Sequence, residues 1–317
     1  MEVPPLRDLV WNKRIASDLQ VAVGTILVID YLQTFASEVK HIWHSPWSAI
    51  KILYLLARYS PFLDAGLIIR YYLTETADLS PQTCRTFLIA GTISVIVTVA
   101  FAEAILFIRV YALSGQSKFM RAYLVIQYLV THVAELALMA KLTSQAGFPI
   151  IPGITEHIGC TPSAPPHTEL VMRVIFGLFV FNGAVLVVIM AWLCYKRFCP
   201  FRVSHIAFVF MRDGFLYFVV IAVIGVVNII VSVETRATNF VLGESHAIFH
   251  SIMACRLVIH LREVATDNTT VEFDRDHRLS RGTGNGVDES SALGILQFGE
   301  RSQAFTIRGM RDPTNSL

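Results

Sequence analysis

Seven long apolar segments dominate this sequence and constrain its fold more than any other feature. Each segment is long enough to cross a hydrocarbon core of about 30 Å as a helix. Lipid offers no hydrogen-bond partner, so a spanning chain must satisfy its own backbone as a helix or a closed barrel, and these segments are continuous rather than alternating. The pattern therefore predicts an all-α integral membrane protein built as a seven-transmembrane-helix bundle. The predicted crossings are about 17–36, 48–73, 87–112, 122–143, 169–195, 208–232 and 240–261.

Composition agrees with a lipid environment. Hydrophobic residues make up 54% of the chain and charged residues only 16%, whereas soluble domains carry about 25% charge. The formal net charge is +2, which provides no broad basic surface for a phosphate backbone. We therefore expect membrane lipids as surroundings and no nucleic-acid partner.

The apolar segments divide the chain into three regions: an N-terminal segment over 1–16, a transmembrane domain over 17–262 and a tail over 263–317. The tail is rich in Asp, Asn, Thr, Gly, Ser and Arg. Such a composition buries too little apolar surface to fold alone, so we expect a disordered tail. An odd number of crossings places the two termini on opposite sides of the membrane.

Loop charges indicate the orientation. The loops on the side of the C-terminus, about 37–47, 113–121 and 196–207, hold most of the loop Lys and Arg residues, and the opposite loops hold only Arg85 and Arg236. Because basic loops are retained in the cytosol, we predict an extracellular N-terminus and a cytosolic tail. A cytosolic partner would then meet the 196–207 loop and the tail. The pattern does not distinguish the plasma membrane from another endomembrane. The basic residues of the inner loops are Lys40, Lys118, Arg121, Lys196, Arg197 and Arg202.

Two cysteines lie on the predicted outer side. Cys84 precedes the third segment, and Cys160 lies in the long loop between the fourth and fifth segments. A disulfide between them is the predicted arrangement, with two free thiols as the alternative.

Ionisable residues inside apolar segments are costly in lipid and face partners or water-filled cavities. Counting about 1.5 Å per residue places Asp30, Arg58, Glu103 and Arg256 about 9 to 15 Å from the cytosolic helix ends. We predict that Arg58 pairs with Asp30 or Glu103 and that Arg256 engages the other. This buried charge network could be a static clasp, a switch or an ion path.

A second group lies nearer the outside and could line an outer cavity: Asp64, His132, Glu135, His246 and His250. Each pair three or four residues apart shares a helix face and could share a metal ion. Such spacing is common by chance, and ordinary buried polar residues are the favoured interpretation. We therefore predict no metal and no cofactor, with His246 and His250 as the metal alternative.

The segment Ile29-Asp-Tyr-Leu-Gln-Thr34, followed by Glu38, Trp43, Trp47 and Ala57-Arg-Tyr59, resembles the opening signature of a family of fungal multipass membrane proteins, domain of unknown function 6533. Three later segments resemble its third, sixth and seventh helix motifs. They are residues 102–113, 212–218 and 254–262.

This resemblance implies a membrane location and a seven-helix body, because the family has no established activity or ligand. It also adds weight to three charged residues within its motifs near the inner face: Arg109, Arg212 and Asp213.

The favoured function is a receptor-like sensor, in which an unknown ligand in the outer cavity biases the buried charge network. A proton- or ion-coupled transporter is the alternative, and a zinc-dependent membrane lipid hydrolase and a scaffold are weaker ones. No Gly-x-Ser-x-Gly, Walker loop or His-Glu-x-x-His occurs, so no catalytic residue is assigned and a non-enzymatic role is favoured.

Overall fold

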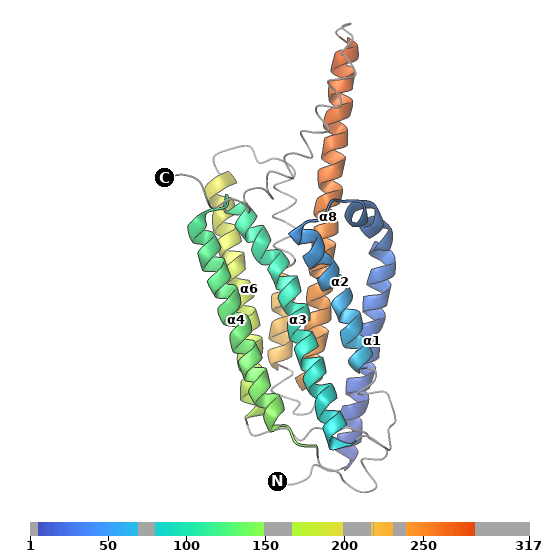
Figure 1. The fold of residues 1–317 in the computed structure, drawn as a ribbon, viewed down its shortest axis with the longest axis vertical. Helices are drawn as coiled ribbons and strands as arrows, with labels where there is room; N and C mark the ends of the chain where they lie inside the picture. The colour runs from blue at the N-terminus through green and yellow to red at the C-terminus, as the bar shows by residue number, and fades with distance from the viewer. Residues whose placement is uncertain are drawn as a thin grey trace. The chain divides into compact units, whose positions relative to one another are not determined.

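The computed structural model describes residues 6–68, 80–148, 167–198, 217, 219–230 and 239–282. Throughout this part the regular elements are helices (Figure 1). A short helix covers Val219–Ile230. The longer elements are α1 (Leu6–Glu38), the π-helix η1 (Val39–Trp43), α2 (Ala49–Ile68), α3 (Pro81–Leu113), α4 (Lys118–Gln145), α6 (Thr168–Phe198) and α8 (Asn239–Gly282).

Four helical stretches are long and apolar enough to cross a membrane: Arg14–Trp43, Pro81–Leu113, Lys118–Gln145 and Thr168–Leu193. They coincide with the first, third, fourth and fifth predicted segments. Their length and composition are those of an integral multipass membrane protein, as the sequence predicted.

The second predicted segment forms α2, which carries three charged residues within its 20 residues. All three, Lys51, Arg58 and Asp64, are buried within the protein. Lys51 Nζ donates to the carbonyl oxygens of Trp43 at 2.8 Å and Ser45 at 2.7 Å, which closes the turn between η1 and α2. The helix therefore turns its charges toward protein rather than lipid.

Two helix limits differ from the predicted ones. α1 begins at Leu6, before the predicted segment at 17, and α8 continues to Gly282. α8 therefore includes residues 263–282, which the sequence analysis assigned to the disordered tail. A helix that is already nucleated needs only one further hydrogen bond per added residue, so it can extend into a polar sequence. The chain forms two compact units, residues 1–45 with 49–261 and residues 46–48 with 262–317.

Local sequence explains how α3 begins and ends. Ser80 caps its N-terminus by accepting a hydrogen bond from the Thr83 amide at 3.3 Å, and Pro81 occupies the first turn. After Ser114 the backbone adopts positive φ at Gly115 and Gln116, which reverses the chain into α4. α3 and α4 therefore run side by side (Figure 1).

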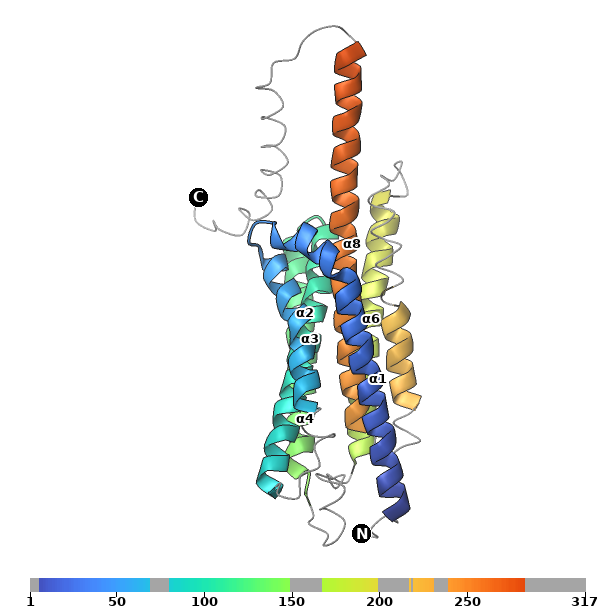
Figure 2. The same ribbon diagram turned by 90° about the vertical axis from the view of Figure 1, so that its right-hand side faces the viewer.

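The main core of the bundle unit lies between α2, α3, α6 and the bundle part of α8. Small residues from three helices, Ala57, Ala102, Ala254 and Cys255, are fully buried there, which allows close backbone approach. A smaller cluster joins α1 to α8 (Figure 2) through Val23, Leu27, Ile248 and Ile252. Large apolar side chains such as Val130 and Val133 of α4 are exposed, as expected for a lipid-facing surface.

Candidate functional site

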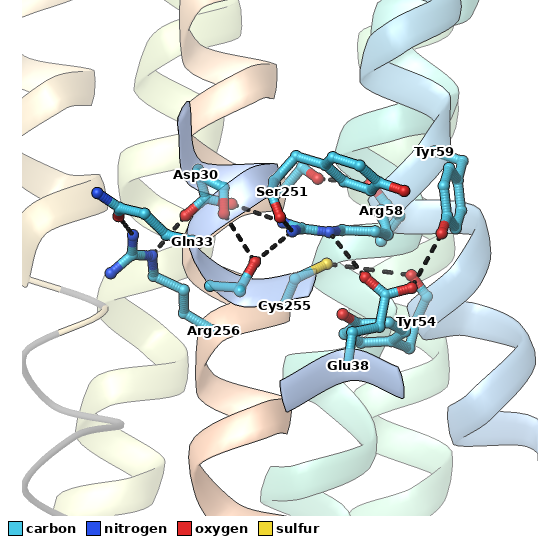
Figure 3. A network of polar contacts seen from close by, with 12 residues as sticks. Asp30, Gln33, Glu38, Tyr54, Arg58, Tyr59, Ser251, Cys255 and Arg256 are labelled. Atoms are coloured by element: carbon cyan, nitrogen blue, oxygen red, sulfur yellow. Dashed lines mark hydrogen bonds and ion pairs between the residues drawn. The ribbon is translucent and has the colours of Figure 1, made fainter. Parts of the chain in front are cut away.

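The bundle holds two clusters of buried ionisable side chains. We call the first the arginine clasp, which consists of Asp30, Glu38, Arg58 and Arg256 (Figure 3). We call the second the Glu103 centre, which consists of Glu103, His132, Glu135, Asn182 and His250.

Arg58 of α2 is the middle of the clasp and is only 1% exposed. Its Nη1 donates to Asp30 Oδ2 at 2.5 Å and its Nε donates to Glu38 Oε2 at 3.4 Å. Its Nη2 donates to the hydroxyl of Thr34 and to the carbonyl oxygen of Tyr31. The guanidinium also lies 5.2 Å from the centre of the Tyr31 ring, a favourable cation–π position. All these partners come from α1, so Arg58 attaches α2 to α1.

Glu38 is the clasp residue that the charge-depth argument missed. Its Oε1 accepts hydrogen bonds from the Tyr59 hydroxyl and from Trp43 Nε1, each at 3.0 Å. Asp30, Thr34 and Glu38 follow one another at four-residue spacing, which places them on one face of α1. This four-residue spacing was the sequence pattern that could have identified Glu38 as a member of the clasp.

Arg256 of α8 completes the clasp. Its Nε donates to Asp30 Oδ1 at 2.5 Å and its Nη2 donates to Gln33 Oε1 at 3.0 Å (Figure 3). Asp30 therefore binds arginines from two helices. Arg256 is 48% exposed, in contrast to Arg58.

We predicted that Arg58 pairs with Asp30 or Glu103 and that Arg256 engages the other, and in the structure Arg58 pairs with Asp30. The pairing of Arg256 with Glu103 was wrong, because Arg256 shares Asp30 instead. Glu103 contacts His250, which lies six residues before Arg256 on α8. Six residues correspond to about 9 Å of helix rise, so the predicted single layer is two layers.

Two contacts attach α8 to α2 beside the clasp (Figure 3). Ser251 Oγ donates to the Ala57 carbonyl oxygen at 2.5 Å, and Cys255 Sγ lies 4.0 Å from the Tyr54 carbonyl oxygen. Cys255 is a buried free thiol.

The Glu103 centre joins α3, α4, α6 and α8. Glu103 Oε2 accepts a hydrogen bond from Asn182 Nδ2 at 2.6 Å and lies 3.4 Å from His132 Nε2. His132 Nδ1 lies 3.0 Å from Glu135 Oε2. Glu103 Oε1 lies 3.8 Å from His250 Nε2. The structure thus combines one residue of the predicted inner layer with three of the predicted outer group.

Two further side chains hold this centre in place. Gln127 Nε2 donates to Asn182 Oδ1 at 2.7 Å, and the Tyr217 hydroxyl lies 2.7 Å from His250 Nδ1. Sequence reasoning missed Asn182 and Gln127 because it scanned the apolar segments for ionisable residues only.

Asp64 lies apart from the Glu103 centre. Its carboxylate accepts hydrogen bonds from the hydroxyls of Ser94 and Thr98 on α3, the second at 2.8 Å. Glu244 of α8 interacts electrostatically with Asp64. It is a buried residue that the sequence analysis did not select.

His246 packs in an aromatic environment. Its ring lies 4.9 Å from the Phe179 ring and 5.7 Å from the His250 ring, centroid to centroid. Within the described ranges, no group of three or more His, Cys, Asp or Glu residues could hold a metal ion. The proposed metal pair His246 and His250 therefore lacks further ligands in the part of the chain that the structure describes.

The remaining predicted residues divide by location. Arg109 is partly buried on α3 and interacts electrostatically with Tyr217 and Cys255. Cys84 is disulfide-bonded. Its predicted partner Cys160 lies outside the described residues. So do Arg212, Asp213 and most of the 196–207 loop.

Comparison with known proteins adds one finding. No curated protein matches the chain. A family model matches residues 19–63, a segment that contains Asp30, Glu38 and Arg58 of the clasp. The segment that attaches α2 to α1 is thus the segment that matches the family of unknown function DUF6533, as its resemblance predicted.

Proposed function

We propose that this protein is a receptor-like sensor, a seven-helix bundle with its N-terminus outside and its tail in the cytosol. Its outer half would receive the ligand, and the arginine clasp would respond. One observation carries the proposal: Asp30 holds two arginines of very different exposure on two different helices. A carboxylate shared in this way offers two arrangements, with α8 attached or released.

The two arms of the clasp differ in how firmly they are held. Arg58 has four side-chain and backbone acceptors on α1. Arg256 has two, and about half of its side chain is exposed. Release of Arg256 leaves Asp30 paired with Arg58, so Asp30 keeps a direct counter-charge. The α8 arm is therefore the one that a signal can move.

The seven-helix topology has separate support. α2 satisfies its charges within the bundle, so its charge content does not argue against a crossing. Residues 239–261 of α8 span about 34 Å as a helix, enough for the seventh crossing. Val219–Ile230 supplies an apolar part of the sixth. The output would then be read by a cytosolic partner at the 196–207 loop and the tail.

Hydrogen–deuterium exchange of the full chain in detergent tests the proposal. We expect Arg256→Gln to raise amide exchange within 248–261 of α8 while the protein remains folded. Arg173→Gln is the matched control, because Arg173 forms a half-exposed ion pair with Glu169 at 3.6 Å. Unchanged exchange in α8, or loss of the whole fold, would identify a static clasp and contradict the sensor.

A proton- or ion-coupled transporter is the second candidate, favoured by the succession of ionisable groups from Glu135 through His132 to Glu103. Ion flux into proteoliposomes that disappears in Arg58→Leu, with folding retained, would support it. Absence of flux in the wild-type protein would remove it.

A further inference from the structure

The Glu103 centre has a charge composition unlike that of the clasp. Its acidic members are Glu103 of α3 and Glu135 of α4, both buried. In the part of the chain that the structure describes, the ion-pair partners of these two carboxylates are the histidines His132 and His250. No permanent cation balances them there.

The charges of the described side chains favour bound protons. With both carboxylates ionised and His132 neutral, the three side chains carry a charge of −2, and two added protons make them neutral. A net charge in a hydrocarbon environment costs several kcal/mol, so bound protons lower the cost of burying these three side chains. The number of protons that the centre holds sets its charge.

The geometry gives these protons a route between two helices. The Nδ1 atom of His132 lies 3.0 Å from Glu135 Oε2. Its Nε2 atom lies 3.4 Å from Glu103 Oε2 and makes no hydrogen bond within the described residues, so transfer to Glu103 requires these two atoms to approach more closely. An imidazole can take up a proton on one nitrogen and release another from the second. When the O–H bond of Glu135 breaks, an N–H bond forms at Nδ1. When the N–H bond at Nε2 breaks, an O–H bond forms at Glu103.

We propose that Glu103, His132 and Glu135 form a buried proton-binding and proton-transfer site, with H⁺ as the ligand exchanged between α4 and α3. The inference is independent of the sensor proposal, because it uses none of the clasp residues.

One end of the site has an acceptor atom without a hydrogen-bond partner. Glu135 is 2% exposed, and its Oε1 atom has no hydrogen-bond partner within the described residues. His132 is the more exposed member, at 12%. Glu135 Oε1 is therefore the acceptor atom available for an incoming proton.

The other end is fixed in place. Asn182 donates to Glu103 Oε2 and is itself held by Gln127. Glu103 Oε1 faces His250 at 3.8 Å, beyond normal hydrogen-bond length, so His250 acts on Glu103 through its field. The Asn182 bond orients the Glu103 carboxylate toward His132.

Other titratable groups surround the site. The Tyr128 ring lies 4.4 Å from the His132 ring, centroid to centroid. His246 stacks on His250, and the Tyr217 hydroxyl contacts His250 Nδ1. Arg109 is an electrostatic neighbour of Tyr217.

Infrared difference spectroscopy of the full chain in lipid vesicles tests the site. Spectra are compared between about pH 8 and about pH 5, a range that spans histidine protonation. We expect the wild-type protein to gain protonated-carboxyl and imidazolium bands in that range. Glu103→Gln and Glu135→Gln should each remove one carboxyl contribution, because glutamine matches glutamate in shape but cannot ionise.

Two further variants make the result decisive. Glu169→Gln removes a half-exposed carboxylate on α6 and should leave these bands unchanged. His132→Gln retains both carboxylates, and we expect it to remove one contribution from the imidazolium band and separate the two carboxyl titrations. Carboxyl bands that persist unchanged in folded Glu103→Gln and Glu135→Gln protein would overturn the proposal. If those variants do not fold, unchanged coupled titration in His132→Gln would overturn it.

Discussion

The arginine clasp and the Glu103 centre both bury two carboxylates and both connect helices that lie far apart in sequence. The clasp balances Asp30 and Glu38 with Arg58 and Arg256, so its two negative and two positive charges cancel. Arginine stays protonated at any physiological pH, so this balance does not depend on bound protons. In the Glu103 centre the balance depends on bound protons. Equally buried carboxylates can therefore be neutralised in two ways: by arginine in one layer and by bound protons in the next.

The largest expected loss of stability comes from removing the Arg58 guanidinium from the clasp. Arg58→Leu leaves Glu38 without its arginine and Asp30 with Arg256 alone. Loss of one partner of a buried ion pair costs about 3–5 kcal/mol, so we expect a large fall in the thermal unfolding midpoint in detergent. Arg173→Leu removes an arginine from a half-exposed ion pair and is the matched control, so it should change the unfolding midpoint little. Equal midpoints for the two variants would contradict a structural role for the clasp.

Replacing Glu103 by leucine should lower the free energy of unfolding by less than Arg58→Leu does. Glu103→Leu removes the acceptor of the Asn182 amide and leaves that group buried without it. An unsatisfied buried donor costs about 1–3 kcal/mol. Glu103→Gln keeps an acceptor oxygen, so its unfolding midpoint should lie closer to that of the wild-type protein. A larger loss for Glu103→Leu than for Arg58→Leu would reverse the comparison.

Within the clasp, the two arginines should differ. Arg256→Gln removes a half-exposed guanidinium while Arg58 still neutralises Asp30, so we expect a loss of about 1–2 kcal/mol. Denaturant or thermal unfolding of both variants in one detergent measures the difference. Similar losses for Arg256→Gln and Arg58→Leu would show that both arms are equally structural.

The smallest expected effect concerns Glu38. Tyr59→Phe removes one hydroxyl donor, while Trp43 and Arg58 still hold the carboxylate. The loss should be about 1 kcal/mol, the net value of a typical hydrogen bond. Tyr123→Phe is a suitable control, because Tyr123 lies exposed on α4.

Apolar segment lengths predicted the helical, multipass membrane architecture, because backbone satisfaction in lipid leaves few alternatives. Depth along the helices also gave Asp30 and Glu103 as the two candidate partners of Arg58, and the structure pairs Arg58 with Asp30. Depth alone could not assign Glu103, since an error of about one turn, or about 5.4 Å, at each of two helix boundaries adds up to the separation of about 9 Å between the two layers. It also carries no information on rotation about each helix axis, which decides that His132 faces Glu103.

Neutral polar residues are the second kind of side chain whose role the sequence analysis could not predict. Asn182 and Gln127 look unremarkable in an apolar segment, and only the packing of α4 against α6 shows that they orient Glu103. The extent of α1 and α8 was also missed, because a polar composition does not stop a helix that a bundle has already nucleated.

The sequence separation of the clasp partners has a consequence for biosynthesis. Arg58 is 28 residues from Asp30 and 20 from Glu38, so both counter-charges precede it from the ribosome. In the seven-helix topology that we propose, the hairpin of α1 and α2 would therefore enter the membrane with its buried arginine already neutralised. Arg256 follows Asp30 by 226 residues and can join only when the last helix is made. The clasp is thus assembled in two stages, and α8 is the last arm to be attached.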